Sequence, residues 1–259
     1  MTSSLMKKNI NPLAFPIGIP YALQFLQNEI RKVSAQRMVI AIDGHSSSGK
    51  STIAKQIAEL LGYIFVDSGA MYRAVTLHLM DHNIPIDNEE LVLSSLDDVN
   101  IAFERSDNGM RTLLNGRDVE ADIRTMSVSE QVSPVATISG VRSFLVRQQR
   151  TMADQQGIVM DGRDIGTVVF PNADVKIFIT ASIAVRTERR YNELRTKGIE
   201  IDKAEIRQNL QERDHIDSTR EDSPLRQAED AVLLDTSELD PTLQLQKSIE
   251  IIIKAGSSV

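Results

Sequence analysis

One eight-residue segment constrains the fold of this 259-residue chain more than any other. Residues 44–51, with the sequence GHSSSGKS, match the pattern G-x-x-x-x-G-K-[S/T]. An apolar run at 38–42 precedes the segment, and an amphipathic helical pattern at 50–61 follows it. Strand, glycine-rich turn and helix in this order are typical of a phosphate-binding loop, whose backbone N–H groups and helix dipole face phosphate oxygens. A Gly/Ser-rich turn without a ligand is the alternative, and it requires four fixed positions to match by chance.

The side chains of this loop predict a nucleoside triphosphate ligand with a metal ion. Lys50 is expected to bridge the β- and γ-phosphates of ATP, and the Ser51 hydroxyl to bind Mg²⁺. We therefore predict a nucleoside triphosphate as ligand and Mg²⁺ as the cofactor. The predicted phosphate-binding residues are Gly44, His45, Ser46, Ser47, Ser48, Gly49, Lys50, Ser51 and Thr52.

The rest of the chain alternates between short apolar runs and helical patterns. The runs at 38–42, 64–66, 158–160, 175–179 and 231–234 are typical of buried parallel strands. Helical patterns cover 50–61, 69–81, 141–155, 181–197 and 243–254. This alternation predicts an α/β fold with a five-stranded, doubly wound parallel sheet. Polar residues follow the strands, at the sheet edge where such folds bind ligands: Asp43, Asp67, Asp161, Thr180 and Asp235.

Two stretches interrupt this alternation. Residues 99–105 and 110–114 flank a Ser-Asp-Asn-Gly turn and predict an antiparallel hairpin within an inserted subdomain at about 84–132. Residues 186–226 carry eight arginines, which we interpret as a cluster that binds anions. A pair of solvated helices with Arg–Glu pairs is the better explanation for most of these arginines.

The first 37 residues form a predicted N-terminal extension. Pro12, Pro16 and Pro20 interrupt its apolar stretch, which argues against a signal peptide. We expect a tail at 1–20 and a short amphipathic helix at 21–33, although an extension with no fold of its own fits as well. No apolar segment reaches the length of about 18 residues that a membrane-spanning helix needs.

Composition excludes several classes of function. The formal net charge of −7 argues against a nucleic-acid or membrane partner. The chain has no cysteine, which excludes disulfides, thiolate metal sites and cysteine nucleophiles. We expect a cytoplasmic monomer. Its four histidines lack obvious catalytic partners and are expected to be non-catalytic: His45, His78, His82 and His215.

Three further motifs occur with the phosphate-binding loop: DSGAMYR at 67–73, DGRDIGT at 161–167, and RDHIDSTR at 213–220, which Ser223-Pro224-Leu225 follows. In this order and spacing, the four motifs resemble those of bacterial cytidylate kinases, over about residues 38–256. The resemblance implies a P-loop kinase fold of three α/β/α layers with an inserted monophosphate-binding subdomain and a helical lid at about 186–224. The core of this predicted domain at 38–256 is then 38–83, 133–185 and 225–256. It also implies transfer of the γ-phosphoryl group of ATP to CMP or dCMP.

The resemblance assigns roles to individual residues. It implies that Lys50, Arg163, Arg220 and Asp161 are catalytic, and that Asp161 holds Mg²⁺ through water opposite Ser51. Ser133, Arg142 and Asp164 are expected to contact the cytosine edge, and Arg213 and Asp217 the ribose from the lid. The full predicted CMP site is Asp67, Ser68, Arg73, Ser133, Arg142, Arg163, Asp164, Arg213, Asp217 and Arg220.

Simpler roles exist for several of these residues. Asp161 and Asp164 are also placed to cap their strand ends, Arg142 to lie solvated in a first helical turn, and Ser133 to cap a helix before Pro134. His45 and the loop serines depart from the family pattern without removing a backbone donor. At the level of function, a broader UMP/CMP kinase and a non-catalytic ATP-binding module are the alternatives. The second leaves the arginines at 73, 163 and 220 unexplained.

Overall fold

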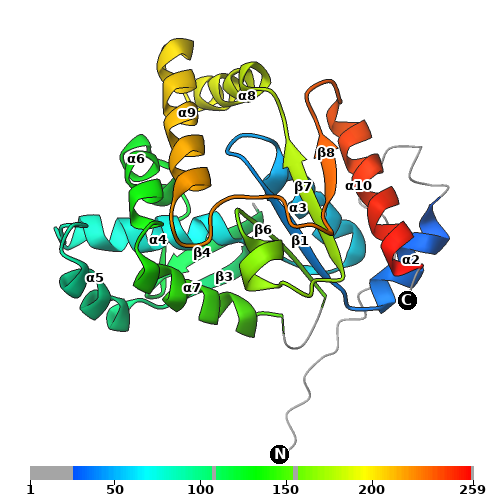
Figure 1. Cartoon of the computed structure of the whole chain (residues 1–259), viewed down its shortest axis with the longest axis horizontal. Coiled ribbons are helices and arrows are strands. Elements are labelled where there is room, and N and C mark those ends of the chain that lie inside the picture. The colour runs from blue at the N-terminus through cyan, green and yellow to red at the C-terminus, as the bar shows by residue number, and fades with distance from the viewer. Residues whose placement is uncertain (1–25, 107–108, 154–156, 258–259) are drawn as a thin grey trace, which may run out of the picture.

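A five-stranded parallel sheet forms the centre of the molecule. The computed structural model describes residues 26–106, 109–153 and 157–257 (Figure 1). The strand order is β2-β6-β1-β7-β8, and every pairing is parallel. The predicted sheet is therefore confirmed, and β1, which leads into the phosphate-binding loop, lies in its middle. The strands are β1 (Val39–Gly44), β2 (Ile64–Asp67), β6 (Ile158–Gly162), β7 (Val175–Thr180) and β8 (Val232–Asp235).

Helices cover both faces of this sheet, because successive strand residues point to opposite sides. Ile40 and Ile42 pack with one group of helices, and Ala41 between them packs with the other. The resulting three α/β/α layers match the predicted architecture. On the first face lie α2 (Gln27–Ala35), α3 (Lys50–Leu61) and α10 (Pro241–Gly256), and on the second α4 (Ser68–Asp81) and α7 (Ser139–Thr151).

The insert contains the predicted hairpin and several helices that were not predicted. Strands β3 (Ile101–Ser106) and β4 (Gly109–Leu114) pair antiparallel, and β5 (Arg117–Asp118) extends this small sheet. Residues 107 and 108 of the predicted turn lie outside the described residues. The unpredicted helices are α5 (Glu89–Ser95), α6 (Met126–Val135) and the short 3₁₀ helices η1 (Leu96–Asp98) and η2 (Asp122–Arg124).

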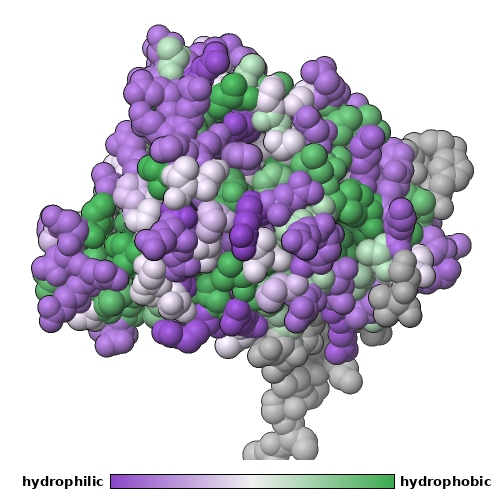
Figure 2. Space-filling model, in the orientation of Figure 1, coloured by the Kyte–Doolittle hydropathy of each residue, from purple (hydrophilic) through white to green (hydrophobic). Residues whose placement is uncertain are grey.

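The predicted lid consists of two helices, α8 (Ile183–Thr196) and α9 (Lys203–Thr219). They pack against each other through a small apolar cluster of Leu194, Ile206 and Leu210. Figure 1 shows both helices beyond the carboxyl end of β7. Hydrophilic side chains dominate their outer surface in Figure 2. The lid thus lies over the sheet edge where the polar strand ends meet.

The N-terminal helix belongs to the apolar core of the sheet. Helix α2 buries Ile30 and Val33 in the same cluster as α3 and α10. Its carboxyl end is also tied to the body, because Ser34 Oγ donates to Leu61 O at 2.5 Å and Gln36 Nε2 to Gly256 O at 3.0 Å. Of the predicted helix at 21–33, residues 21–25 lie outside the described residues, as does the predicted tail at 1–20, and within the described residues α2 ends two residues later than predicted, at Ala35. The division into an extension and a kinase domain stays a prediction.

Other helix boundaries differ from the predictions by a few residues. The largest difference is at the helix predicted for 141–155, which begins at Ser139 and ends at Thr151. Within the part of the chain that the structure describes, no helix has both the length and the apolar character that crossing a membrane requires.

Candidate active site

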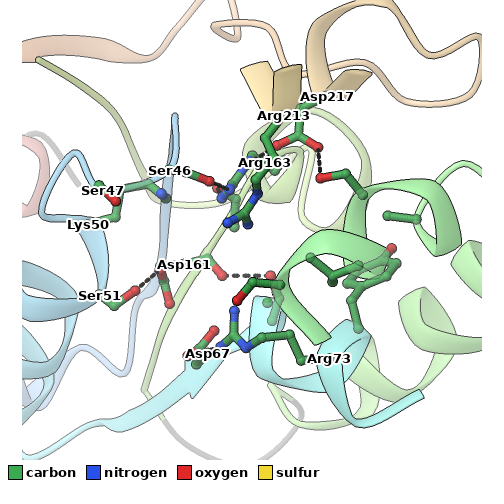
Figure 3. Close-up of a pocket in the computed structure, with 18 of the residues that line it drawn as sticks. Ser46, Ser47, Lys50, Ser51, Asp67, Arg73, Asp161, Arg163, Arg213 and Asp217 are labelled. Atoms are coloured by element: carbon green, nitrogen blue, oxygen red, sulfur yellow. Dashed lines mark hydrogen bonds and ion pairs between the residues drawn. The ribbon is translucent and has the colours of Figure 1, made fainter. Parts of the chain in front are cut away.

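A cleft of about 350 Å³ lies between the phosphate-binding loop, the insert and the lid (Figure 3). Its size is in the usual range for a small-molecule site. Three predicted residues do not line it, namely Gly44, His45 and Ser48. The predicted residues that do line it are Ser46, Ser47, Gly49, Lys50, Ser51, Thr52, Asp67, Ser68, Arg73, Ser133, Arg142, Asp161, Arg163, Asp164, Arg213, Asp217 and Arg220.

The phosphate-binding loop has the backbone curvature that its glycines suggest. Gly49 adopts a φ of +96° directly before α3, so the first N–H groups of this helix face the cleft. Gly44 ends β1 with a φ of +146°, and a Cβ at this position would lie 1.9 Å from Ile179 O of the neighbouring strand. Gly44 is therefore a residue of the sheet, whereas Ser46, Ser47 and Gly49 of the loop line the cleft.

Lys50 lies beneath the loop rather than in solvent. Its ammonium group donates to His45 O at 2.7 Å, and the side chain is only 5% exposed. Burial, together with repulsion from Arg163, lowers the pKa of Lys50 to about 7. An anion in the cleft would oppose this shift, because a nearby negative charge stabilises the ammonium form.

Ser51 and Asp161 form a pair of hard oxygen ligands. Ser51 Oγ donates to Asp161 Oδ2 at 2.6 Å. The second carboxylate oxygen, Oδ1, is buried and has no hydrogen-bond partner among the described residues. Burial and the neighbouring Asp67 raise the pKa of Asp161 to about 6. An unsatisfied buried carboxylate oxygen beside a hydroxyl fits Mg²⁺, which takes few protein ligands when phosphates and water supply the others.

Arginines from α4, from the segment after β6 and from α9 line the cleft. Arg73 Nη2 donates to Asp67 Oδ2 at 2.9 Å, and Arg163 Nε donates to Asp217 Oδ2 at 2.7 Å (Figure 3). Arg213 Nε is buried without a partner among the described residues, and burial together with Arg163 lowers the pKa of Arg213 to about 10. Buried guanidinium groups with free N–H donors provide a site for an anion such as phosphate.

The three residues predicted to contact a base line the same cleft, and two of them, Arg142 and Asp164, are in contact. Arg142 Nη2 donates to Asp164 Oδ2 through a short contact, and the Arg142 guanidinium lies 5.8 Å from the ring centre of Tyr72. Ser133 Oγ donates to Asp217 Oδ1 at 3.3 Å. This corner of the cleft therefore offers a hydroxyl, a guanidinium and a carboxylate, a set that can match donors and acceptors on one edge of a planar base.

The simpler roles suggested for these three residues are wrong. Arg142 is only 2% exposed, so it is not a solvated helix residue. Ser133 lies inside α6 and does not cap a helix. Asp164 precedes the π-helical turn η3 (Ile165–Val169) but makes no capping hydrogen bond with its side chain. All three side chains instead line the cleft.

The eight arginines of 186–226 fall into three groups that the sequence did not separate, and the first, which lines the cleft, is Arg190, Arg213 and Arg220. Arg186 pairs with Asp214 at 2.7 Å, and Arg189 Nη1 donates to Ser48 O at 2.9 Å. These two side chains support the phosphate-binding loop from behind, so they are not solvated. Only Arg195, Arg207 and Arg226 are the exposed residues that the solvated-helix interpretation expects.

Asp43 connects the loop strand to the segment that carries Arg163 and Asp164. Its two carboxylate oxygens accept hydrogen bonds from Ile165 N and Gly166 N, both at 2.8 Å. Burial raises the pKa of Asp43 to about 7, although these two N–H donors act in the opposite direction. The sequence placed Asp43 at a strand end but assigned it no role.

Comparison with known proteins agrees with this geometry. The family model for cytidylate kinase matches residues 40–255. A cytidylate kinase of Parabacteroides distasonis is 53% identical over 219 residues, which cover 82% of this chain and 94% of the relative. Those of Porphyromonas gingivalis and Lactobacillus johnsonii are 52% and 46% identical, covering 82% and 84% of this chain and 93% and 94% of the relatives. The chain belongs to the cytidylate kinase family.

Several residues that line the cleft were not predicted from the family motifs in the sequence. Tyr72 lies inside the DSGAMYR motif, and the only signal for it in the sequence was its position near the predicted site residues Asp67 and Arg73. The others come from the insert, α6 and the lid, where no motif marks them: Arg124, Ser129, Val132, Ala136, Arg190 and Glu193. Their positions depend on how the insert and the lid pack, which local sequence does not specify.

Proposed function

We propose that this member of the cytidylate kinase family transfers the γ-phosphoryl group of ATP to CMP or dCMP. The observation that carries the proposal is that a phosphate-binding loop and a second cluster of buried, partly unpartnered arginines line the same cleft. One polyphosphate accounts for the loop, whereas the arginines opposite require a second anion. Two phosphorylated ligands in one cleft are what phosphoryl transfer between nucleotides needs.

The donor site would be formed by the loop and the start of α3. Backbone N–H groups there would hold the phosphates of ATP, and Lys50 would follow the transferring group once its contact with His45 O is exchanged for phosphate. Ser51 and Asp161 would hold Mg²⁺, which supplies charge neutralisation when bound. Because the transition state carries charge on phosphoryl oxygens, positioning and electrostatics provide most of the catalysis.

The acceptor site would be formed by the arginine cluster and the base corner. Arg73, Arg163 and Arg220 would bind the acceptor phosphate and the transferring group. Asp164 would accept from the cytosine amine, while Arg142 and Ser133 would donate to N3 and O2. Uracil presents the opposite pattern at two of these positions, so the same set disfavours UMP. Arg213 and Asp217 would meet the ribose, and the lid would exclude water from the reaction.

The decisive experiment is a panel of nucleoside monophosphates with ATP and Mg²⁺, with ADP release as the signal. We expect turnover with CMP and dCMP and much slower turnover with UMP. Comparable rates with UMP would favour the broader UMP/CMP kinase. ATP binding without turnover of any monophosphate would favour a non-catalytic ATP-binding module.

Lys50→Ala provides the matching test of the donor site. The lysine charge acts on phosphates, so the variant is expected to lose transfer while its melting temperature changes little. Near-normal turnover would overturn the assignment of the loop. The cytoplasmic location and the monomeric state remain predictions from the sequence.

A further inference from the structure

One arginine of the insert faces the same cleft, although no motif marks it. Arg124 is the last residue of η2 and lines the cleft together with Arg73. Its side chain is 36% exposed, whereas that of Arg73 is 15% exposed. Arg124 therefore keeps accessible guanidinium surface at a position where the cleft already gathers cations.

The orientation of Arg124 is fixed from two sides. Its Nε and Nη2 donate to Glu120 Oε1 at 3.0 and 2.8 Å, and Nη2 also donates to Asp67 Oδ2 at 2.9 Å. Glu120 is itself held by the small sheet of the insert, because Thr112 N and Oγ1 donate to its Oε2 at 3.1 and 2.7 Å. A guanidinium held in this way loses little side-chain freedom when a ligand binds.

Arg124 and Arg73 converge on a single oxygen. Both Nη2 atoms lie 2.9 Å from Asp67 Oδ2. Burial raises the pKa of Asp67, but the two arginines outweigh this effect and lower it below its usual range. The carboxylate thus stays ionised and aligns two guanidinium groups side by side. Arg124 Nη1 donates to no described residue and remains available to a ligand.

We propose that Arg124 is a further contact for the phosphate of the acceptor nucleotide, supplied by the insert. The inference rests on the proposed function, since it places the acceptor phosphate among the arginines of this cleft. Arg73 on α4 and Arg124 on η2 would hold that phosphate from two different structural units. Binding of the acceptor would in this way draw the insert against the core.

The competing explanation is that Arg124 only ties the insert to α4. The chain offers a matched control for this, because Arg117 on β5 also forms an ion pair with α4. Arg117 Nη2 lies 2.9 Å from Asp81 Oδ2, at the opposite end of the helix and outside the cleft. Substitution of either arginine removes one ion pair between the insert and α4. Only the substitution of Arg124 also removes a hydrogen-bond donor from the cleft.

The test compares Arg124→Gln and Arg117→Gln in the full-length protein by steady-state kinetics with CMP and ATP. For Arg124→Gln we expect KM for CMP to rise about tenfold or more, the loss typical of a charged hydrogen bond to phosphate. KM for ATP should stay within about twofold of the wild-type value in both variants. KM for CMP in Arg117→Gln should stay within the same range. The proposal would be overturned if the two substitutions raised KM for CMP equally. It would also be overturned if Arg124→Gln raised KM for CMP and KM for ATP by the same factor.

Arg124→Lys keeps a cation opposite Asp67 and serves if the glutamine variant does not fold. A single ammonium lacks the planar fork, so KM for CMP should still rise several-fold with an unchanged melting temperature. Wild-type affinity for CMP in this variant would count against the contact. Absence of CMP turnover in the wild-type protein, by contrast, would refute the proposed function and not this contact alone.

Discussion

Asp217 illustrates how one side chain serves two partners in the cleft. Its carboxylate accepts from Arg163 Nε and from Ser133 Oγ. Burial raises the pKa of Asp217, but Arg163 and Arg213 outweigh this and lower it. The residue is therefore an ionised acceptor beside the proposed ribose position.

Asp217→Ala should weaken catalysis with both CMP and dCMP, because Arg163 loses its ion-pair partner. If the carboxylate also accepts from the 2′-hydroxyl, CMP should lose a further factor of about ten or more in kcat/KM. dCMP has no such hydrogen bond to lose. Steady-state kinetics with the two acceptors measures the difference, and parallel losses would leave Asp217 with the ion pair alone.

Ser47 carries backbone strain within the phosphate-binding loop. Its φ of +59° lies in the left-handed region, which disfavours side chains with a Cβ. Ser47→Gly should raise the free energy of unfolding by about 0.5–1 kcal/mol, since relief of strain exceeds the entropy cost of glycine. Ser48→Gly is the control: Ser48 is not among the positive-φ residues, so the substitution should lower stability. Chemical denaturation measures both, and a loss at position 47 would disprove the strain.

At the scale of elements, helix α2 extends the core beyond the segment that matches the family. Ile30 is 1% exposed within the cluster that α2 shares with α3 and α10. Ile30→Ala should lower the free energy of unfolding by about 2–4 kcal/mol, as expected for a buried aliphatic truncation. KM for CMP should not change. Arg31→Ala, at an exposed position of the same helix, is the control. Denaturation curves that coincide for the two variants would show that packing of α2 is dispensable for stability.

Asp43 joins β1 to the η3 turn, and its titration gives a pH prediction. Its pKa of about 7 in the folded protein exceeds the ordinary value of 3.8, so the folded state binds the proton more tightly. Stability contributed by this group is therefore complete below about pH 4 and is lost as pH rises toward 7. Relative to Asp43→Asn, the wild type should lose on the order of 1–4 kcal/mol over this range. Urea denaturation at several pH values measures this, and parallel profiles would contradict it.

The sequence predicted those strands and helices whose apolar pattern is visible within a short stretch of consecutive residues. The strands and the helix after the loop were recoverable because apolar runs and glycine positions identify them within a few residues. Helix α6 was missed because Pro134 and several small residues obscure its pattern. Arg186 and Arg189 were also indistinguishable from exposed arginines, since their partners include loop carbonyls supplied by the tertiary fold. The motif residues of the cleft were predicted, whereas Arg124 was not.

At the scale of the whole molecule, net charge and local charge have opposite signs. The chain carries a formal charge of −7, yet the cleft gathers arginines from α4, the insert, α9 and the segment after β6. If the local cluster dominates, CMP affinity should fall several-fold between about 20 and 300 mM KCl, because salt screens the attraction. Calorimetric titration measures the trend. Affinity that rises with salt would mean that the net negative charge dominates.

The close approach at Gly44 affects how mutational data on this loop should be interpreted. Any Cβ there would collide with the carbonyl of Ile179, and Gly44 pairs with this residue in the sheet. A substitution would push β7 away from β1 and so disturb the strand that leads into the lid. Inactive Gly44 variants in a mutational scan would therefore report a misaligned sheet, and they should not be counted as evidence about nucleotide contacts.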